Sequence, residues 1–121
     1  MMAKILIVED DADLVETYTD LLEMRGHSVH WASRITEAND FLVEVQPEII
    51  TLDLNLPGTS GAATLNFVQT AKALSQCKII VISGHTEMMS GQDWMADVDL
   101  ILTKPVDNYQ FVTMVDRLLS T

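Results

Sequence analysis

The sequence predicts an α/β fold: a single doubly wound, five-stranded parallel sheet of strand order 2-1-3-4-5, with helices on both faces. The first observation is that short strand-like segments alternate with longer helix-like segments along all 121 residues. The second is that four of the five strand-like segments are almost continuously apolar, as parallel strands covered by helices on both faces are. The third is that each of these four segments ends in polar side chains.

The expected strands are short and mostly rich in Ile, Leu and Val, and they span residues 4–9, 28–32, 48–53, 78–82 and 100–103. Strands 1, 3, 4 and 5 are expected to be buried on both faces. The second strand alternates instead, with Val29 and Trp31 on one side, so we place it at an edge of the sheet. Right-handed crossover connections then favour the order 2-1-3-4-5.

The expected helices show apolar residues at helical spacing, and they span residues 12–25, 35–45, 62–74, 86–96 and 107–119. Gly26 is a C-terminal stop for the first helix, and Pro47 follows the end of the second. Ser60, in the turn 57–61, is a candidate N-cap for the third. The segment 86–96 has the poorest apolar pattern of the five.

Composition limits the classes of function that this chain can serve. A hydrophobic content of 48% with 21% charged residues is typical of a folded globular protein. The chain lacks an apolar stretch long enough for a bilayer and lacks signal-peptide features at its start, so we expect a cytoplasmic protein without membrane association. Cys77 is the only cysteine, which excludes an internal disulfide. The net charge of −11 repels polyanions, so we expect no direct nucleic-acid binding by this domain.

Polar residues follow the four apolar strands in an arrangement that suggests chemistry. Glu9-Asp10-Asp11 follow the first strand, Asp53 the third, Ser83 the fourth, and Lys104 with Pro105 the fifth. Because the carboxyl ends of parallel strands meet at one edge of the sheet, these groups should converge near the switch point between strands 1 and 3. Clustered carboxylates with a hydroxyl and an ammonium are typical of a site for a divalent cation and a phosphoryl group.

Carboxylates that share one sheet edge repel each other unless some are protonated or a cation joins them. Mg²⁺ prefers oxygen ligands and usually takes one or two protein carboxylates. We expect Asp10 and Asp53 as direct ligands, Glu9 through a water molecule, and the backbone carbonyl of Asn55 as a further ligand. Asp53 can also act as a nucleophile that forms an aspartyl phosphate.

Two further side chains could contact the phosphoryl oxygens. The ammonium of Lys104 can balance their charge, and the hydroxyl of Ser83 can donate a hydrogen bond to one of them.

Several other polar, aromatic and sulfur-containing side chains have ordinary structural explanations. Asp11 and Asp13 fit the N-terminus of a helix, where the helix dipole favours acids. His27 and His30 flank the second strand and are expected at the surface or sheet edge. Trp31 is expected in core or interface packing. Cys77 is expected to be buried and to have no role in the site.

The chain resembles the receiver domain of two-component response regulators along essentially its whole length. The matching segments run from Ile5 to Asp11, from Leu52 to Gly61, from Val81 to Gly84 and from Leu102 to Pro105. Any one of these segments alone is a weak signal, but all four in order at the ends of the right strands are specific. The resemblance implies that residues 1–121 form one receiver domain.

The resemblance implies a function and partners. Asp53 would accept a phosphoryl group from a phosphohistidine on a sensor histidine kinase or a histidine phosphotransfer domain, with Mg²⁺ bound beside it. Ser83 and Lys104 would move toward the phosphoryl group, and the face made by segments 86–96, 100–103 and 107–119 would repack. An output domain or protein would receive the signal. The Lys104–Pro105 bond is expected to be cis, as in the family.

Two positions depart from the family pattern, and two others vary within the family. Ile101 stands where the family usually has a Tyr or Phe that changes rotamer, and Ser60 stands where many relatives have Asp, which we interpret as a turn or capping detail. Asn55 and His85 occupy variable positions that influence dephosphorylation in the family. Ile101 motivates an alternative, a pseudo-receiver that acts as a protein-interaction module without productive phosphorylation.

Two other classes of protein fit the sequence less well. A flavodoxin-like electron carrier needs a phosphate-binding loop rich in Ser, Thr or Gly after the first strand, where this chain has acids. A haloacid-dehalogenase phosphatase needs a second Asp two residues after the first, where Asn55 stands. We therefore expect a phosphoacceptor and not an enzyme that acts on free phosphoesters.

Overall fold

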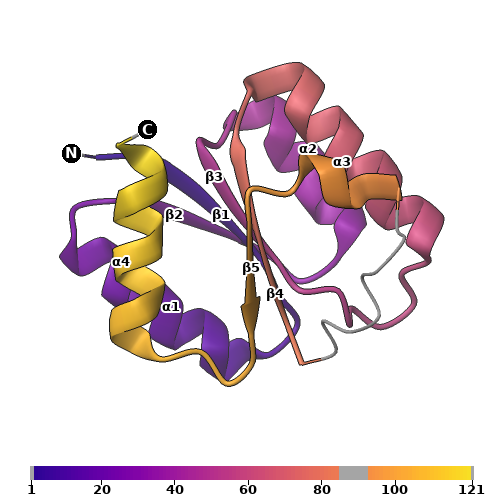
Figure 1. Ribbon diagram of the computed structural model, residues 1–121. Coiled ribbons are helices and arrows are strands. Elements are labelled where there is room, and N and C mark those ends of the chain that lie inside the picture. Colours follow the sequence, from indigo (N-terminus) through magenta and orange to yellow (C-terminus); the bar gives the residue numbers. More distant parts are fainter. Residues whose placement is uncertain (1, 85–92, 121) are drawn as a thin grey trace.

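The computed structural model describes residues 2–84 and 93–120, and across these residues it contains one parallel sheet with helices on both faces (Figure 1). The strand order is β2-β1-β3-β4-β5, which confirms the predicted fold class and topology. The strands are β1 (Lys4–Val8), β2 (Ser28–Ala32), β3 (Ile49–Leu52), β4 (Lys78–Ser83) and β5 (Leu100–Thr103). The helices are α1 (Ala12–Met24), α2 (Ile35–Glu44), α3 (Gly61–Ser75), α4 (Asn108–Leu119) and the short 3-10 helix η2 (Asp93–Asp97).

Side-chain caps explain where three of the helices begin. The carboxylate of Asp11 accepts hydrogen bonds from two backbone N–H groups in the first turn of α1, so Asp11 is an N-cap. Ser60 caps α3, as predicted, and Asp107 caps α4, which places the predicted start of that helix one residue too early. Gly26, with φ of +87°, follows the last turn of α1 in a conformation that favours glycine.

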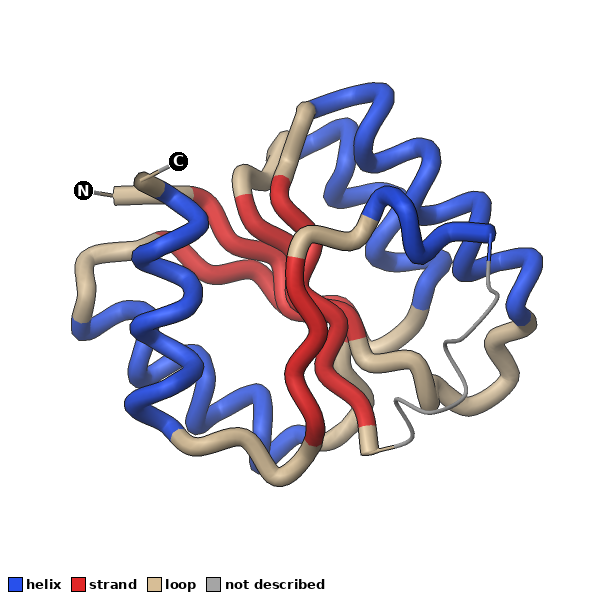
Figure 2. Tube along the Cα trace, in the orientation of Figure 1, coloured by secondary structure: helices blue, strands red, loops and turns tan. Residues whose placement is uncertain are grey.

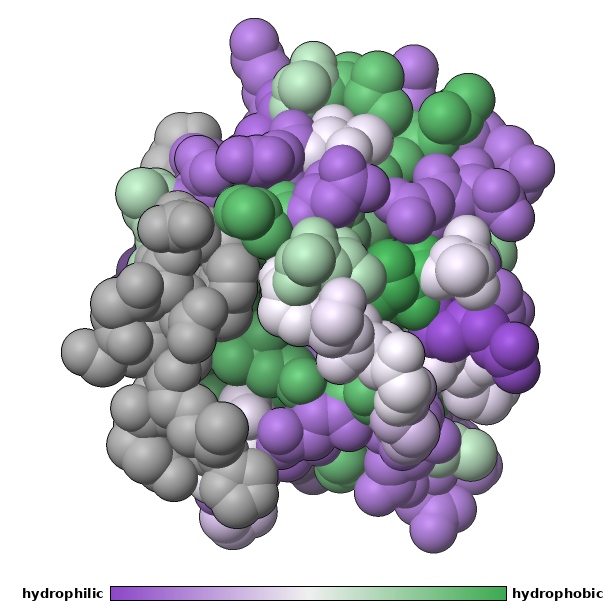
Figure 3. Space-filling model, turned by 90° about the vertical axis from the view of Figure 1, so that its right-hand side faces the viewer, coloured by the Kyte–Doolittle hydropathy of each residue, from purple (hydrophilic) through white to green (hydrophobic). Residues whose placement is uncertain are grey.

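Alternate residues of each central strand contact different helical layers. In β1, Ile5 and Ile7 pack against α1 and α4, whereas Leu6 and Val8 pack against α2 and α3. Figures 1 and 2 show the two layers on opposite sides of the twisted sheet. The side of the α2–α3 layer presents mainly hydrophilic residues mixed with smaller hydrophobic patches (Figure 3). In the part of the chain that the structure describes, no helix combines the length and hydrophobicity that a membrane span needs.

The prediction that the fifth strand is buried on both faces is wrong. Leu102 is buried against the α1–α4 layer, but Ile101 on the opposite face is 39% exposed. Among the residues that the structure describes, β5 is an edge strand that pairs only with β4, and no helix covers this part of its outer face. Most of the predicted helix 86–96, together with His85, lies outside the described residues, and its last part forms η2.

The prediction for one side chain beside the second strand also needs correction, and for a second side chain one of two alternatives is excluded. His27 is buried, not exposed, because its Nδ1 accepts a 3.1 Å hydrogen bond from the Ala3 backbone N–H. Trp31, expected in core or interface packing, is not in the core: it is 44% exposed, and its indole donates a hydrogen bond to the backbone carbonyl of Glu9, directly after β1. His30 is half-buried and its ring contacts Phe41, while Cys77 is buried as expected.

Candidate functional site

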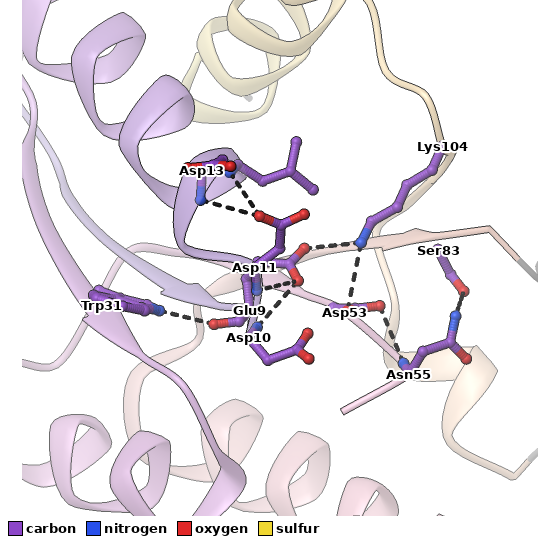
Figure 4. Close-up of polar contacts among 10 residues, drawn as sticks. Glu9, Asp10, Asp11, Asp13, Trp31, Asp53, Asn55, Ser83 and Lys104 are labelled. Atoms are coloured by element: carbon purple, nitrogen blue, oxygen red, sulfur yellow. Dashed lines mark hydrogen bonds and ion pairs between the residues drawn. The ribbon is translucent and has the colours of Figure 1, made fainter. Parts of the chain in front are cut away.

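The parallel register brings the polar strand ends together at one edge of the sheet. Val8 pairs with Leu52 and Leu52 pairs with Val81, so the residues that follow β1 and β3 lie side by side. The cluster, shown in Figure 4, contains every candidate site residue named from the sequence: Glu9, Asp10, Asp53, Asn55, Ser83 and Lys104. Residues up to 95 positions apart in the chain thus lie close together, as the strand order predicted.

Three carboxylates form the centre of this cluster. Glu9, Asp10 and Asp53 each offer one oxygen, and these oxygens all lie within 4.8 Å of one another. Glu9 and Asp53 are buried at 3% and 4% exposure, whereas Asp10 is open to solvent. The Glu9 carboxylate accepts hydrogen bonds from the backbone N–H groups of Asp10 (3.0 Å) and Asp11 (3.2 Å). The tight loop after β1 therefore fixes the direction of this acid.

Lys104 supplies the positive charge that this cluster needs. Its Nζ lies 2.9 Å from Glu9 Oε1 and 3.5 Å from Asp53 Oδ2. Its backbone N–H donates to the Ser83 carbonyl at 3.0 Å, and the following peptide bond to Pro105 is cis, as expected. These contacts direct the lysine side chain across the strand ends toward the acids (Figure 4).

The charges in the cluster shift each other's ionisation. Burial raises the pKa of Glu9 to about 7, although the hydrogen bonds from Lys104 and the Asp11 backbone act in the opposite direction. Burial by itself lowers the pKa of Lys104, but the hydrogen bond to Glu9 and the charges of Asp53 and Glu9 outweigh it and raise the pKa overall. Bringing these acids together therefore has an electrostatic cost, which the ammonium of Lys104 partly offsets.

Asn55 links the acid of β3 to the hydroxyl of β4. Its backbone N–H donates to Asp53 Oδ1 at 3.0 Å, and its side-chain Nδ2 donates to Ser83 Oγ at 3.3 Å. Ser83 is fully buried. The sequence did not indicate the bond between Asn55 and Ser83, because it depends on how closely the loop after β3 approaches the end of β4.

Sequence reasoning also missed Trp31. Its indole Nε1–H donates a 2.8 Å hydrogen bond to the backbone carbonyl of Glu9. A tryptophan near the end of the strand beside β1 was the available signal, since neighbouring parallel strands end together.

Two grooves give access to the cluster from solvent. One, of about 550 Å³, borders Asp10 and lies between the loop before α2 and the loop before α3, with Arg34 and Thr59 among its lining residues. The other, of about 340 Å³, lies between the start of α1 and the loop after β5 and is lined by Tyr18, Lys104 and others. A second molecule could therefore approach the acids without unfolding of the site.

The residues present fit a hard divalent cation. Glu9, Asp10 and Asp53 provide only oxygen donors, and two of these donors are buried beside a third that is open to solvent. A cation of the Mg²⁺ type accepts a few protein oxygens and keeps water in its remaining positions, which suits an acidic cluster that is partly solvent-accessible. A cation bound there would also relieve the repulsion among the acids.

Transcriptional regulators are among the curated proteins with similar sequences. The chain is 29% identical over 116 residues to the phosphate regulon transcriptional regulatory protein PhoB of Pseudomonas aeruginosa, covering 95% of this chain and 51% of that protein. It is 30% identical over 109 residues to the DNA-binding response regulator MtrA of Mycobacterium tuberculosis, covering 90% of this chain and 43% of that protein. The chain therefore spans about half the length of the curated relatives it matches or less.

Solved structures and the family comparison agree. A receiver domain from Methylobacillus flagellatus matches with a TM-score of 0.81 and 29% identity, covering 98% of this chain and 99% of that one. A signal receiver domain from Bermanella marisrubri matches with a TM-score of 0.85 and 28% identity over the same shares. Residues 5–116 match the model of the response regulator receiver domain. With the parallel 2-1-3-4-5 sheet and the acidic cluster at its edge, these matches show that the chain belongs to the receiver domain family of two-component response regulators.

Proposed function

We propose that Asp53 is the phosphoacceptor of this receiver and takes a phosphoryl group from a phosphohistidine on a partner protein. The observation that carries the proposal is the position of its carboxylate, buried at the end of β3 within 3.5 Å of the Lys104 ammonium and beside two other acids. The Lys104 ammonium places positive charge beside the carboxylate oxygen that would act as the nucleophile. Residues 1–121 act in this proposal as one receiver domain.

The transfer needs one bond to form and one to break. An oxygen of Asp53 attacks the phosphorus, the O–P bond forms, and the P–N bond to the partner's imidazole breaks with its electron pair moving to the nitrogen. Lys104 stabilises the charge on the phosphoryl oxygens, and the Ser83 hydroxyl donates a hydrogen bond to one of them. The Lys104 ammonium already donates a 2.9 Å hydrogen bond to Glu9, and the Ser83 hydroxyl already accepts a 3.3 Å hydrogen bond from the Asn55 side chain.

Mg²⁺ would be held by Asp10 and Asp53 directly, by Glu9 through water and by the backbone carbonyl of Asn55. When bound, it supplies positive charge that offsets the charge of the transferring phosphoryl group. The exposure of Asp10 leaves room for water and for an incoming phosphoryl oxygen on the solvent side.

The partner is proposed to be a sensor histidine kinase or a histidine phosphotransfer domain, and the signal then passes to an output domain or protein. Movement of Ser83 and Lys104 toward the phosphoryl group would reach the face of η2, β5 and α4, because Lys104 directly follows the last residue of β5. The alternative of a pseudo-receiver has no support in the site, where the acids and the lysine expected of a phosphoacceptor are in mutual contact.

Incubation with Mg²⁺ and acetyl phosphate, followed by intact-protein mass spectrometry, tests the proposal. The wild-type chain should gain one phosphoryl group, and Asp53→Asn should gain none. Asp13→Asn is the matched control, because Asp13 is an exposed acid in the first turn of α1, and it should gain the group as the wild type does. Uptake by Asp53→Asn, or no uptake by the wild type, would contradict the proposal.

A further inference from the structure

The peptide group between Glu9 and Asp10 is held by hydrogen bonds on both of its sides. Its carbonyl oxygen accepts the indole N–H of Trp31 at 2.8 Å, and its N–H donates to the Glu9 carboxylate at 3.0 Å. Because a peptide group is planar, two bonds to its opposite sides fix its rotation about the single bonds that flank it. Figure 4 shows the indole on one side of the loop and the acids on the other.

The Trp31 indole supplies a hydrogen bond between β1 and β2 just beyond the point where their backbone pairing ends. β1 and β2 pair in register as far as Val8 and Ala32, and the Glu9 N–H still donates to the Ala32 carbonyl at 3.1 Å. After β2 the chain leaves the sheet and enters α2. The next acceptor on the β1 side is the Glu9 carbonyl, and the Trp31 side chain supplies its donor. The first residues of the acidic loop are thereby fastened to the edge strand.

This fastening matters most for Asp10. Glu9 and Asp53 are buried, and Lys104 lies within 3.5 Å of both. Asp10 is exposed, and among the described residues its hydrogen bonding is through its backbone N–H to Glu9. The place of the Asp10 carboxylate therefore depends on the orientation of the peptide group that carries it.

We propose that Trp31 is a positioning residue for the cation site, and that its indole N–H holds the Glu9–Asp10 peptide so that the Asp10 carboxylate stays with those of Glu9 and Asp53. The proposal deepens the proposed function, on which it rests, because it assigns part of the affinity for Mg²⁺ to a side chain outside the acid cluster. Packing alone explains Trp31 poorly, since 44% of it remains exposed.

The test separates the N–H group from the bulk of the ring. Trp31→Phe keeps an aromatic ring and removes the donor, whereas His30→Phe changes an aromatic ring on the same strand that contacts Phe41 and not the acidic loop. Binding of Mg²⁺ to each protein is measured by isothermal titration calorimetry. Trp31→Phe should bind Mg²⁺ about 3- to 10-fold more weakly than the wild type, the cost of one lost hydrogen bond. His30→Phe should differ by less than about twofold.

Phosphoryl uptake from acetyl phosphate gives a second readout that general damage to the fold would not reproduce. Trp31→Phe should be slow at low Mg²⁺ concentration and should reach the wild-type rate when Mg²⁺ is saturating. Equal Mg²⁺ affinities of Trp31→Phe and the wild type would overturn the inference, as would a rate deficit that saturating Mg²⁺ leaves in place.

A measurement on the wild type covers the case in which Trp31→Phe does not fold. The indole N–H resonance of Trp31, assigned through its ring in a ¹⁵N-labelled sample, should shift on addition of Mg²⁺, and a resonance that does not move would overturn the inference. A wild type that takes up neither Mg²⁺ nor phosphoryl groups overturns the proposed function itself. A wild type that does both, with Trp31→Phe unchanged, overturns only the role of Trp31.

Discussion

Lys104 Nζ lies 2.9 Å from Glu9 Oε1, although the two residues are 95 positions apart in the chain. Glu9 is buried at 3% exposure, and the pair joins the end of β5 to the end of β1 across the cluster of acids. The Lys104 ammonium therefore places positive charge beside the same acids that a bound cation would contact. An added cation would therefore compete with the Lys104 ammonium for the same carboxylates.

Lys104→Met should tighten Mg²⁺ binding by roughly fivefold, because it removes a positive charge beside the acids that we propose bind the cation. The same change should slow phosphoryl uptake at Asp53 by tenfold or more (about 1.4 kcal/mol), because the charge that stabilises the phosphoryl oxygens is lost. Calorimetric titration and uptake from acetyl phosphate measure the two effects. Lys78→Met is the control and should change neither, because Lys78 begins β4 and lies at the end of this strand away from Ser83 and the acids. Weaker Mg²⁺ binding by Lys104→Met would contradict this account.

Asp10→Asn should stabilise the metal-free protein by about 0.5–1 kcal/mol, because it removes one of three mutually repelling carboxylates. It should also abolish most of the rise in melting temperature that Mg²⁺ gives the wild type, since a bound ligand stabilises only the state that binds it. Thermal unfolding with and without Mg²⁺ measures both effects. Asp20→Asn, an exposed acid on α1, should retain the response to Mg²⁺. A variant that Mg²⁺ still stabilises fully would exclude Asp10 as a ligand.

Asp99→Asn should lower the free energy of unfolding at neutral pH by about 1–3 kcal/mol. Asp99 Oδ2 accepts bonds from Lys72 Nζ at 2.6 Å and from the Ile79 N–H at 2.7 Å, and so ties α3 to the start of β4. Burial raises the pKa of Asp99, but the bonds from Lys72 and Ile79 outweigh it and lower the pKa overall. Because a carboxylate with a lowered pKa stabilises the fold only when ionised, its contribution is complete above the ordinary value of 3.8.

The difference between the wild type and Asp99→Asn should therefore shrink as the pH falls below 3.8 and through the lowered pKa of the folded state. Urea denaturation at a series of pH values measures it. Asp40→Asn, an exposed acid on α2, serves as the control and should change the free energy by less than about 0.5 kcal/mol. A difference that stays constant down to low pH would show that the carboxylate charge of Asp99 is not what stabilises this contact.

Ile101→Tyr should change the free energy of unfolding by less than about 0.5 kcal/mol, because the side chain is 39% exposed on the open face of β5. Its neighbour gives the contrast: Leu102→Ala should cost about 2–5 kcal/mol, because Leu102 is buried against α1 and α4. Denaturant unfolding measures both. Phosphoryl uptake by Ile101→Tyr should match the wild type, and a large loss would mean that position 101 acts on the site and not only on the surface of β5.

The positions of strands and helix ends were predicted correctly where a single local pattern of residues specifies them. Continuous apolar runs identified β1, β3 and β4, and a capping serine and a glycine stop marked the ends of α3 and α1. It failed for β5, whose apolar residues resemble those of a central strand although one face is exposed. A strand at the edge of a sheet can carry the same residues as a buried one, since what covers its faces is decided by distant parts of the chain.

The candidate site divides in the same way. By itself, the sequence determined which strands end in acids, a hydroxyl and a lysine, and the order of the strands that brings them to one edge, because apolar periodicity and crossover handedness are local or topological rules. Only the tertiary structure decided that Lys104 contacts Glu9 more closely than Asp53, that Asn55 reaches Ser83, and that the Trp31 indole holds the acidic loop. Those contacts depend on side-chain directions and loop paths within a few ångströms, which packing of the whole domain sets and no short stretch of sequence encodes.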